Sequence, residues 1–275
     1  MIKLAERLNL PENLINELGK LNEGEISSLA EKCLENGFSA LKRKSDIERL
    51  GVILCCALKA KKQYEGLGIS DEIYYHTMSD IRIWCENNKN KGLKNYGWLS
   101  NHVRCELFRL GRLQFQLYPC KNRTLIYKKL PFDYGESLVY VHIPQGEKLS
   151  PEECIRSFEM AEEFFKKYFP DYNYRYYFCE SWLLYEGNKE FMKEDSNILK
   201  FASMFNHAYS VKIDEQAIER IFGKRKLFKK NYPENTSLQK MLMYGKEASN
   251  RKQEIDRQHY TIPNQRPKDK HCGKI

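Results

Sequence analysis

A carboxylate interrupts the run of aromatic and aliphatic residues between Arg175 and Tyr185, whose sequence is RYYFCESWLLY. Such a run is typical of a buried strand, and Glu180 and Ser181 stand in its middle. A charged group inside a sheet is costly unless it is paired or neutralised. Glu180 therefore either faces outward or takes part in chemistry, with a pKa raised by desolvation or lowered by a partner.

Two more side chains in the second half of the chain could take part in a reaction. His142 lies near the end of the apolar stretch ESLVYVHIPQ at 136–145, where it is a candidate base or a polar guide for a substrate. A strand-end histidine that bonds only to backbone is the commoner case. Cys179 together with such a histidine would suggest a cysteine nucleophile, but no motif of a known cysteine hydrolase surrounds it.

The cysteines do not follow a disulfide or zinc pattern. Their number, nine, is odd, no C-x-x-C occurs, and Cys55 and Cys56 lie inside an apolar helical run. We expect reduced, mostly buried thiols and no metal site.

The charge of the chain leaves the class of partner open. The net charge is +9, with basic clusters at 42–44, 223–230 and 266–275. Nucleic-acid binding would need aromatic interleaving or a recognition motif, and neither occurs, so we expect no specific nucleic-acid partner. The longest apolar run, at 51–58, is too short to cross a bilayer, and the N-terminus is amphipathic rather than signal-like. We expect a cytoplasmic protein without membrane contact.

The first 107 residues have the apolar spacing of helices. Four groups share this period: Leu14, Ile15 and Leu18; Ile26, Leu29 and Cys33; Ile47, Leu50, Ile53, Leu54 and Ala57; and Ile73, Thr77, Ile81 and Trp84. Gly37 is expected to close one helix, Ser45 to cap the next with Glu48, and Gly66 with Gly68 to mark a further break.

At 108–119 the period changes to two. Leu113, Phe115 and Leu117 alternate with Arg112, Gln114 and Gln116, which predicts one half-exposed strand. A returning strand is expected over 124–130, and further strands near 137–143, 174–184 and 208–213.

The clearest helix begins at Pro151, where Ser150 and Glu153 are spaced as a capping box. Its expected apolar face comprises Ile155, Phe158, Ala161, Phe165 and Tyr168. Further helices are expected over about 188–205, 215–222 and 237–250.

The order strand, helix, strand, helix, strand predicts an α/β layer after the helical first half. We expect an α+β or α/β protein with a helical region at 1–107, a mixed sheet flanked by helices at 108–262, and a basic tail at 263–275.

Five stretches of the second half succeed one another: FRLGRLQF, VHIPQGEKLSPEECIRSFEMAEEFF, CESWLL, DSNILKF and ENTSLQKML. Their order and spacing resemble the GNAT-like C-terminal domain of bacterial acyltransferase-domain proteins. In that family a helical N-acyltransferase N-terminal domain precedes it. The resemblance extends over about residues 97–245, and the helical first half fits the N-terminal partner more loosely.

The resemblance implies transfer of an acyl group from an acyl-CoA thioester to a small-molecule amine, by direct attack in a ternary complex. GNAT enzymes hold acyl-CoA where two parallel strands splay apart, and a loop before the next helix binds the pyrophosphate. By analogy this loop is IPQGEKLS, in which Ile143, Gln145 and Gly146 would bind the cofactor. Backbone amides around His142 and Ile143 would polarise the thioester carbonyl.

The resemblance also implies roles for residues on later strands. Strand order would place Glu180 beside His142, with one of them as the base that deprotonates the amine. Tyr209, or alternatively Tyr185, would protonate the leaving thiolate.

Ser181 and Asn197 would bind substrate in this scheme. The stretch DSNILKF also offers Asp195 and Ser196 as simple helix caps, which is the commoner role for such residues.

The predicted cofactor loop departs from the GNAT pattern Q/R-x-x-G-x-G/A, because its only glycine is Gly146. Glu152 and Glu153 follow in the first helical turn, where carboxylates suit the helix dipole but repel a phosphate. The alternative is a non-catalytic binding or scaffold protein that keeps the fold and has lost CoA binding.

Overall fold

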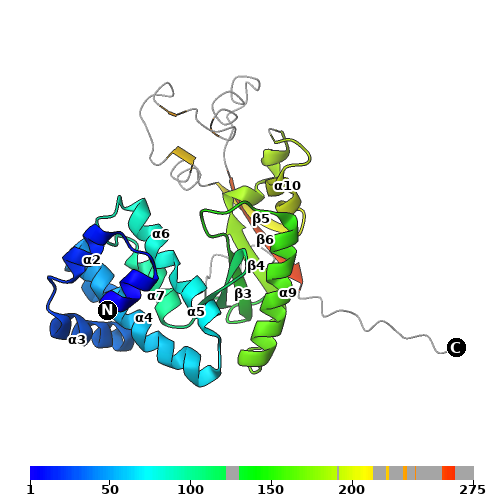
Figure 1. Cartoon of the computed structure of the whole chain (residues 1–275). Coiled ribbons are helices and arrows are strands. Elements are labelled where there is room, and N and C mark those ends of the chain that lie inside the picture. The colour runs from blue at the N-terminus through cyan, green and yellow to red at the C-terminus, as the bar shows by residue number, and fades with distance from the viewer. Residues whose placement is uncertain are drawn as a thin grey trace. The chain divides into compact units, whose positions relative to one another are not determined.

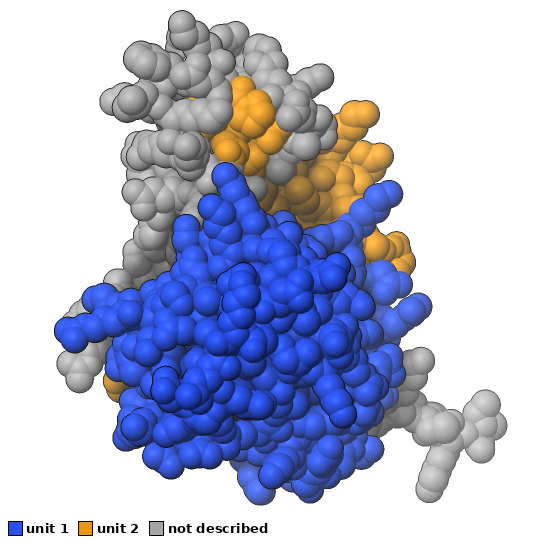
Figure 2. Space-filling view, turned by 60° about the vertical axis from the view of Figure 1, so that its left-hand side comes forward, with its two compact units in different colours: residues 1–118, 142–148, 153–173 blue, residues 119–141, 149–152, 174–275 orange. Residues whose placement is uncertain are grey.

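The computed structural model describes residues 1–121, 130–190, 192–212, 221–222, 232–233, 239 and 256–263. The chain divides into two compact units, which Figure 2 colours separately. Unit 1 comprises Met1–Tyr118, His142–Lys148 and Glu153–Asn173, and unit 2 comprises Pro119–Val141, Leu149–Glu152 and Tyr174–Ile275. The predicted strand at 124–130, the predicted helices at 215–222 and 237–250 and the predicted tail lie wholly or mostly outside the described residues.

The first half of unit 1 is helical, as predicted (Figure 1). Its elements are α1 (Ile2–Arg7), α2 (Glu12–Leu18), α3 (Glu23–Asn36), the 3₁₀ helix η1 (Phe38–Arg43), α4 (Asp46–Leu67), α5 (Asp71–Met78), α6 (Asp80–Asn87) and α7 (Tyr96–Val103).

Helix α4 is the helix against which most of the others pack. It contacts α1, α2, α3, α5 and α7, and every residue from Leu50 to Ala57 is buried. The predicted capping box is present, because Ser45 and Glu48 satisfy each other's backbone N–H groups. The helix ends at Gly68 in the left-handed conformation, as the sequence indicates.

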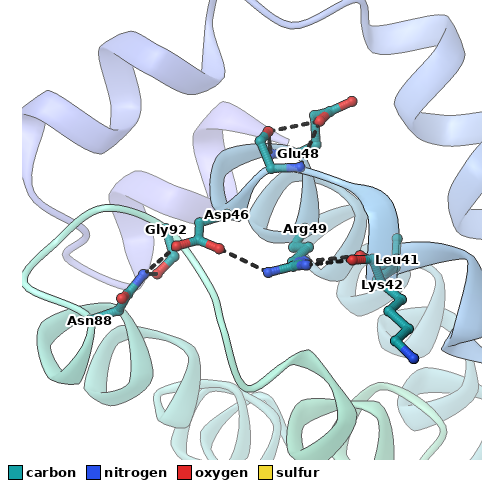
Figure 3. Close-up of polar contacts among 8 residues, drawn as sticks. Leu41, Lys42, Asp46, Glu48, Arg49, Asn88 and Gly92 are labelled. Atoms are coloured by element: carbon teal, nitrogen blue, oxygen red, sulfur yellow. Dashed lines mark hydrogen bonds and ion pairs between the residues drawn. The ribbon is translucent and has the colours of Figure 1, made fainter.

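A polar network at the start of α4 fixes the loop before α7 (Figure 3). Asp46 accepts hydrogen bonds from Arg49 at 2.8 Å and from Asn88 at 2.9 Å, and Arg49 also donates to two carbonyl oxygens of η1. Gly92 has a φ of 103°, and a Cβ there would lie 2.3 Å from the Asp46 carbonyl oxygen. Arg49 also lies over the Tyr96 ring, so the network anchors the first turn of α7.

The predicted half-exposed strand at 108–119 is wrong in two respects. The segment forms two antiparallel strands, β1 (Leu107–Leu110) and β2 (Leu113–Pro119), joined by a turn with Gly111 at a φ of 66°. Arg112 and Gln114, expected to be solvated, are buried. Their polar groups have partners inside the unit, which is why burial is tolerated.

Aromatic rings form the core between the hairpin and α9 (Pro151–Tyr168). Phe108 is fully buried against Tyr64, Phe164, Phe165 and Phe169, with ring centroids 4.8–6.4 Å apart.

The predicted apolar face of α9 is partly wrong, because Ile155 is 51% exposed while Cys154, Ser157 and Phe164 are buried. Ser157 accepts the backbone N–H of Arg112 and donates to the Glu153 carbonyl, which compensates for its burial.

Unit 2 contains a mixed sheet, as predicted. Its strands are β3 (Ser137–His142), whose last residue belongs to unit 1, β4 (Tyr176–Ser181), β5 (Asn206–Lys212) and β6 (Asp256–Pro263). Within the unit their order is β3-β4-β6-β5, with β3 and β4 parallel and the other pairs antiparallel. Tyr177, Phe178 and Cys179 are all buried, so both faces of β4 are covered.

The single helix expected at 188–205 is wrong. The chain instead forms the 3₁₀ helices η2 (Trp182–Leu184) and η3 (Glu186–Glu190) and the short helix α10 (Asn197–Ala202). Ser196 caps α10 by accepting the Ile198 N–H, in accord with the capping role considered for it.

Within the described ranges, no helix has the length and apolar character needed to span a membrane. The eight described cysteines are free thiols, and all except the half-buried Cys105 are buried.

Candidate functional site

A buried carboxylate organises the polar groups of unit 1. Asp80 begins α6, and its Oδ2 accepts the indole N–H of Trp98 at 2.8 Å and that of Trp84 at 3.3 Å. The same oxygen lies 3.1 Å from Nε2 of His102, on α7. Asp80 is 4% exposed and His102 is fully buried, so these contacts replace water around the carboxylate.

Burial alone would raise the pKa of Asp80, since desolvation disfavours the ionised form. The hydrogen bond and charge of His102, with donors from Trp98 and Gln114, outweigh burial and lower the pKa of Asp80 to about 2. Asp80 is therefore a carboxylate at neutral pH and acts as an acceptor for its neighbours.

Trp98 connects this carboxylate to His142, one of the site residues predicted from the sequence. The ring of Trp98 meets the ring of His142 edge to face, with centroids 4.8 Å apart. On another side, Nε2 of His142 lies 2.9 Å from Oε1 of Gln116, on β2. Because an amide oxygen only accepts, Nε2 carries the proton and Nδ1 is the basic nitrogen.

His142 is held in its neutral form. The residue is half-buried, and desolvation together with the charge of His102 lowers the pKa of His142 to about 3. The charge of Asp80 opposes the shift only in part. An imidazole with so low a pKa accepts a proton poorly, so the geometry favours a hydrogen-bonding guide over a general base.

The predicted cofactor loop follows His142, and a buried arginine holds it. The Arg112 guanidinium donates to the carbonyl oxygens of Pro144, Glu147 and Lys148 at 2.8–3.0 Å. A carbonyl and the following N–H point in opposite directions across a trans peptide. The N–H groups of Gln145 and Lys148 are therefore directed away from Arg112, on residues that are exposed.

Two further contacts fix this loop within unit 1. Arg109 donates to Oε1 of Glu147 at 2.6 Å, and Gln145 accepts from Asn87 of α6 at 3.2 Å. Gly146 has a φ of 109°, so the loop turns at its only glycine.

The other predicted site residues lie in unit 2. Glu180 is half-buried near the end of β4, where its backbone pairs opposite His259. The Ser181 hydroxyl accepts the Leu183 N–H and thereby caps η2. Tyr209 lies in β5 with its backbone opposite His259, and its side chain is outside the described part of the structure.

Asn197 is the exposed first residue of α10.

The structure therefore brings His142, Ile143, Gln145 and Gly146 together on one strand end and loop. The expected neighbourhood of Glu180 and His142 remains a prediction. Sequence reasoning missed Asp80, His102 and Arg112. Arg109, Arg112 and Gln114, polar residues interspersed among the apolar ones of the hairpin, were the available signal for buried polar contacts.

Comparison with known families agrees with this architecture. A model described as the GNAT-like C-terminal domain matches residues 107–252, which is more than half of the chain. A model described as the N-acyltransferase N-terminal domain matches residues 1–105. The chain belongs to this GNAT-like family. The resemblance inferred from the five sequence stretches is confirmed.

Solved structures of an acyltransferase have the same fold. Three of them match at 20% identity over 95% of this chain and 86% of theirs. The complex with decanoyl-CoA and teicoplanin gives a TM-score of 0.77, the complex with decanoyl-CoA 0.77, and the complex with CoA and 10C-teicoplanin 0.75. Among curated proteins the comparison finds no match.

No cluster of three potential metal ligands occurs among the residues that the structure describes.

Proposed function

We propose that this GNAT-like protein transfers an acyl group from an acyl-CoA thioester to the amine of a small molecule. The observation that carries the proposal is the loop between His142 and α9, whose carbonyl groups bind Arg112 and whose N–H groups at Gln145 and Lys148 face outward. N–H groups that point away from Arg112 on exposed residues before a helix suit phosphate oxygens. The acyltransferase neighbours bind decanoyl-CoA and CoA, which supports the same class of donor here.

In the proposed reaction the amine nitrogen attacks the thioester carbonyl carbon in a ternary complex. A C–N bond forms, the C–S bond breaks, and CoA leaves as a thiolate that takes up a proton. Glu180 is the proposed base for the amine proton, and Tyr209 is the proposed donor to the thiolate. No covalent acyl-enzyme forms.

His142 has a guiding role in this scheme. With a neutral ring and a proton on Nε2, it orients a polar group of the donor or acceptor while backbone amides near Ile143 polarise the carbonyl. Ser181 and Asn197 are proposed contacts for the substrate.

The experiment is chemical denaturation with and without decanoyl-CoA. A ligand that binds only the native state at 100 times its Kd stabilises the fold by about 2.7 kcal/mol. We expect a stabilisation of this size, and a smaller one with free CoA at the same concentration.

The second candidate function is a non-catalytic binding or scaffold protein. It is favoured by the single glycine of the loop and by Glu152, whose pKa the Ser150 hydroxyl lowers, so that a carboxylate stands at the start of α9. This candidate predicts no stabilisation by decanoyl-CoA at any concentration.

A further inference from the structure

The cluster around Asp80 is more polar than packing requires. Buried ion pairs can often be replaced by apolar side chains without loss of stability. Here a fully buried histidine faces the Asp80 carboxylate, and its other nitrogen, Nδ1 of His102, has no hydrogen-bond partner among the described residues. An unmatched polar atom in a core is destabilising, so the cluster suggests a role beyond folding.

Trp98 connects this cluster to His142. Its indole N–H is fixed by the Asp80 carboxylate at 2.8 Å, and the ring of the same side chain packs edge to face on His142. Trp84 also donates to Oδ2 of Asp80, over the longer distance of 3.3 Å. The two indoles therefore share an acceptor, and Trp98 carries the contact to His142.

Gln116 holds the imidazole from β2, and Trp98 holds it from α7. Among the described residues, the charges that act on the ring are those of His102 from α7 and Asp80 from α6. Helix α7, which carries Trp98 and His102, is anchored at its first turn by the contact between Arg49 and the Tyr96 ring.

We propose that Asp80 and His102 are positioning residues that, through Trp98, fix His142 in one ring orientation and one tautomer. The Asp80 carboxylate holds the Trp98 indole, the indole wall prevents the imidazole from turning, and Gln116 selects the tautomer with the proton on Nε2. The expected effect on turnover rests on the proposed acyl transfer, whereas the expected effect on the ring orientation and tautomer of His142 does not.

The test is the tautomer of His142, read from its ring nitrogen chemical shifts in ¹⁵N-labelled full-length protein. Wild type is expected to give one tautomer, with the proton on Nε2. Trp98→Phe keeps an aromatic ring but removes the N–H donor, and Asp80→Asn keeps the shape but removes the charge. Both are expected to give mixed tautomers of His142 and a kcat lowered roughly 10-fold, with KM for decanoyl-CoA within about twofold of wild type.

Trp84→Phe is the matched control, because it removes the other indole donor from the same oxygen. It is expected to leave both the tautomer and kcat unchanged. A single unchanged tautomer in folded Trp98→Phe and Asp80→Asn would overturn the inference, and if Asp80→Asn does not fold, Trp98→Phe decides alone. Absence of acyl-CoA turnover in wild type would instead contradict the proposed function, while the tautomers still decide the positioning role.

Discussion

The polar residues of the two units differ in how they are held. In unit 1, Asp80 and His102 are buried, and the groups around them come from α6, α7 and β2. In unit 2, Glu180 is half-buried near a strand end, Ser181 caps the next turn, and Asn197 is exposed. Unit 1 therefore fixes the orientation of its polar side chains through contacts within the fold. The polar residues of unit 2 instead remain accessible to solvent, as contact with a substrate requires.

The largest expected effect concerns the aromatic core of unit 1. Phe108→Ala removes the ring that packs on Tyr64, Phe164, Phe165 and Phe169, and should lower the free energy of unfolding by about 3–5 kcal/mol. A denaturant melt measures it. Ile155→Ala, on the exposed face of α9, is the control and should change stability by less than about 0.5 kcal/mol. Equal losses in both variants would contradict the packing described for α9.

The next largest effect concerns Glu180, the proposed base for the amine proton. Glu180→Gln preserves shape, so turnover per folded molecule should fall roughly 100-fold while decanoyl-CoA binding barely changes. Kinetics beside a denaturant melt separate the two roles. Glu190→Gln, an exposed carboxylate in η3, should behave as wild type. Unchanged turnover in folded Glu180→Gln removes it from the mechanism, and a loss that follows only the folded fraction makes it a structural anchor.

The dependence of folding stability on acidic pH should distinguish the contributions of Asp80 and His142. The pKa of Asp80 is about 2 in the folded state and about 3.9 in an unfolded chain, so its ionised form stabilises the fold above pH ~4. This contribution, about 2 kcal/mol, is lost as the pH falls from ~4 to ~2. Melts from pH 2 to 7 should show that Asp80→Asn reduces the slope in this window. A slope unchanged in the variant would mean that Asp80 is not the group responsible.

His142 should also stabilise the fold less as the pH falls, but over a higher pH range than Asp80. Its pKa is about 3 when folded and about 6.5 when unfolded, so the unfolded chain binds the proton first and stability falls as the pH drops below ~6.5. His142→Gln should flatten the curve between pH ~6.5 and ~3 and leave the Asp80 window in place. A curve in that range identical to wild type would contradict the neutral buried imidazole.

A smaller effect tests the arginine that holds the loop. Arg112→Gln cannot reach all three carbonyl oxygens of the loop, so KM for decanoyl-CoA should rise roughly 10-fold with kcat within about twofold. Arg156→Gln, at an exposed arginine that pairs with Glu153, is the matched control and should leave both constants unchanged. A fall in kcat at constant KM would assign Arg112 to chemistry rather than to donor binding.

Local patterns predicted much of the fold because their causes are local. The capping box at Ser45, the helix stop at Gly68 and the apolar strands β3 and β4 depend on neighbours within a few residues. The hairpin at Gly111 was missed because residues 113–117 alternate cleanly, and a strand with this period does not show where its partner begins.

The candidate site was predictable only on its β3 side. His142 and the following loop were found from their place before the helix that begins at Pro151, but Asp80 and His102 are 22 positions apart and on different helices. No spacing rule joins such residues, because tertiary packing alone brings them together. The rotated face of α9 has a similar cause, since Ser157 is buried through its hydrogen bond with the Arg112 backbone.

The most direct test of acyl transfer is a rapid-quench single turnover followed by mass spectrometry. The protein is mixed with one equivalent of decanoyl-CoA and a panel of small primary amines. Direct attack predicts that free CoA and one decanoyl amide appear in equal amounts and at the same rate, while the protein mass stays unchanged throughout. A decanoyl adduct on the protein that forms before the amide and decays into it would contradict direct attack, and decanoyl-CoA that remains intact and unbound would contradict the function itself.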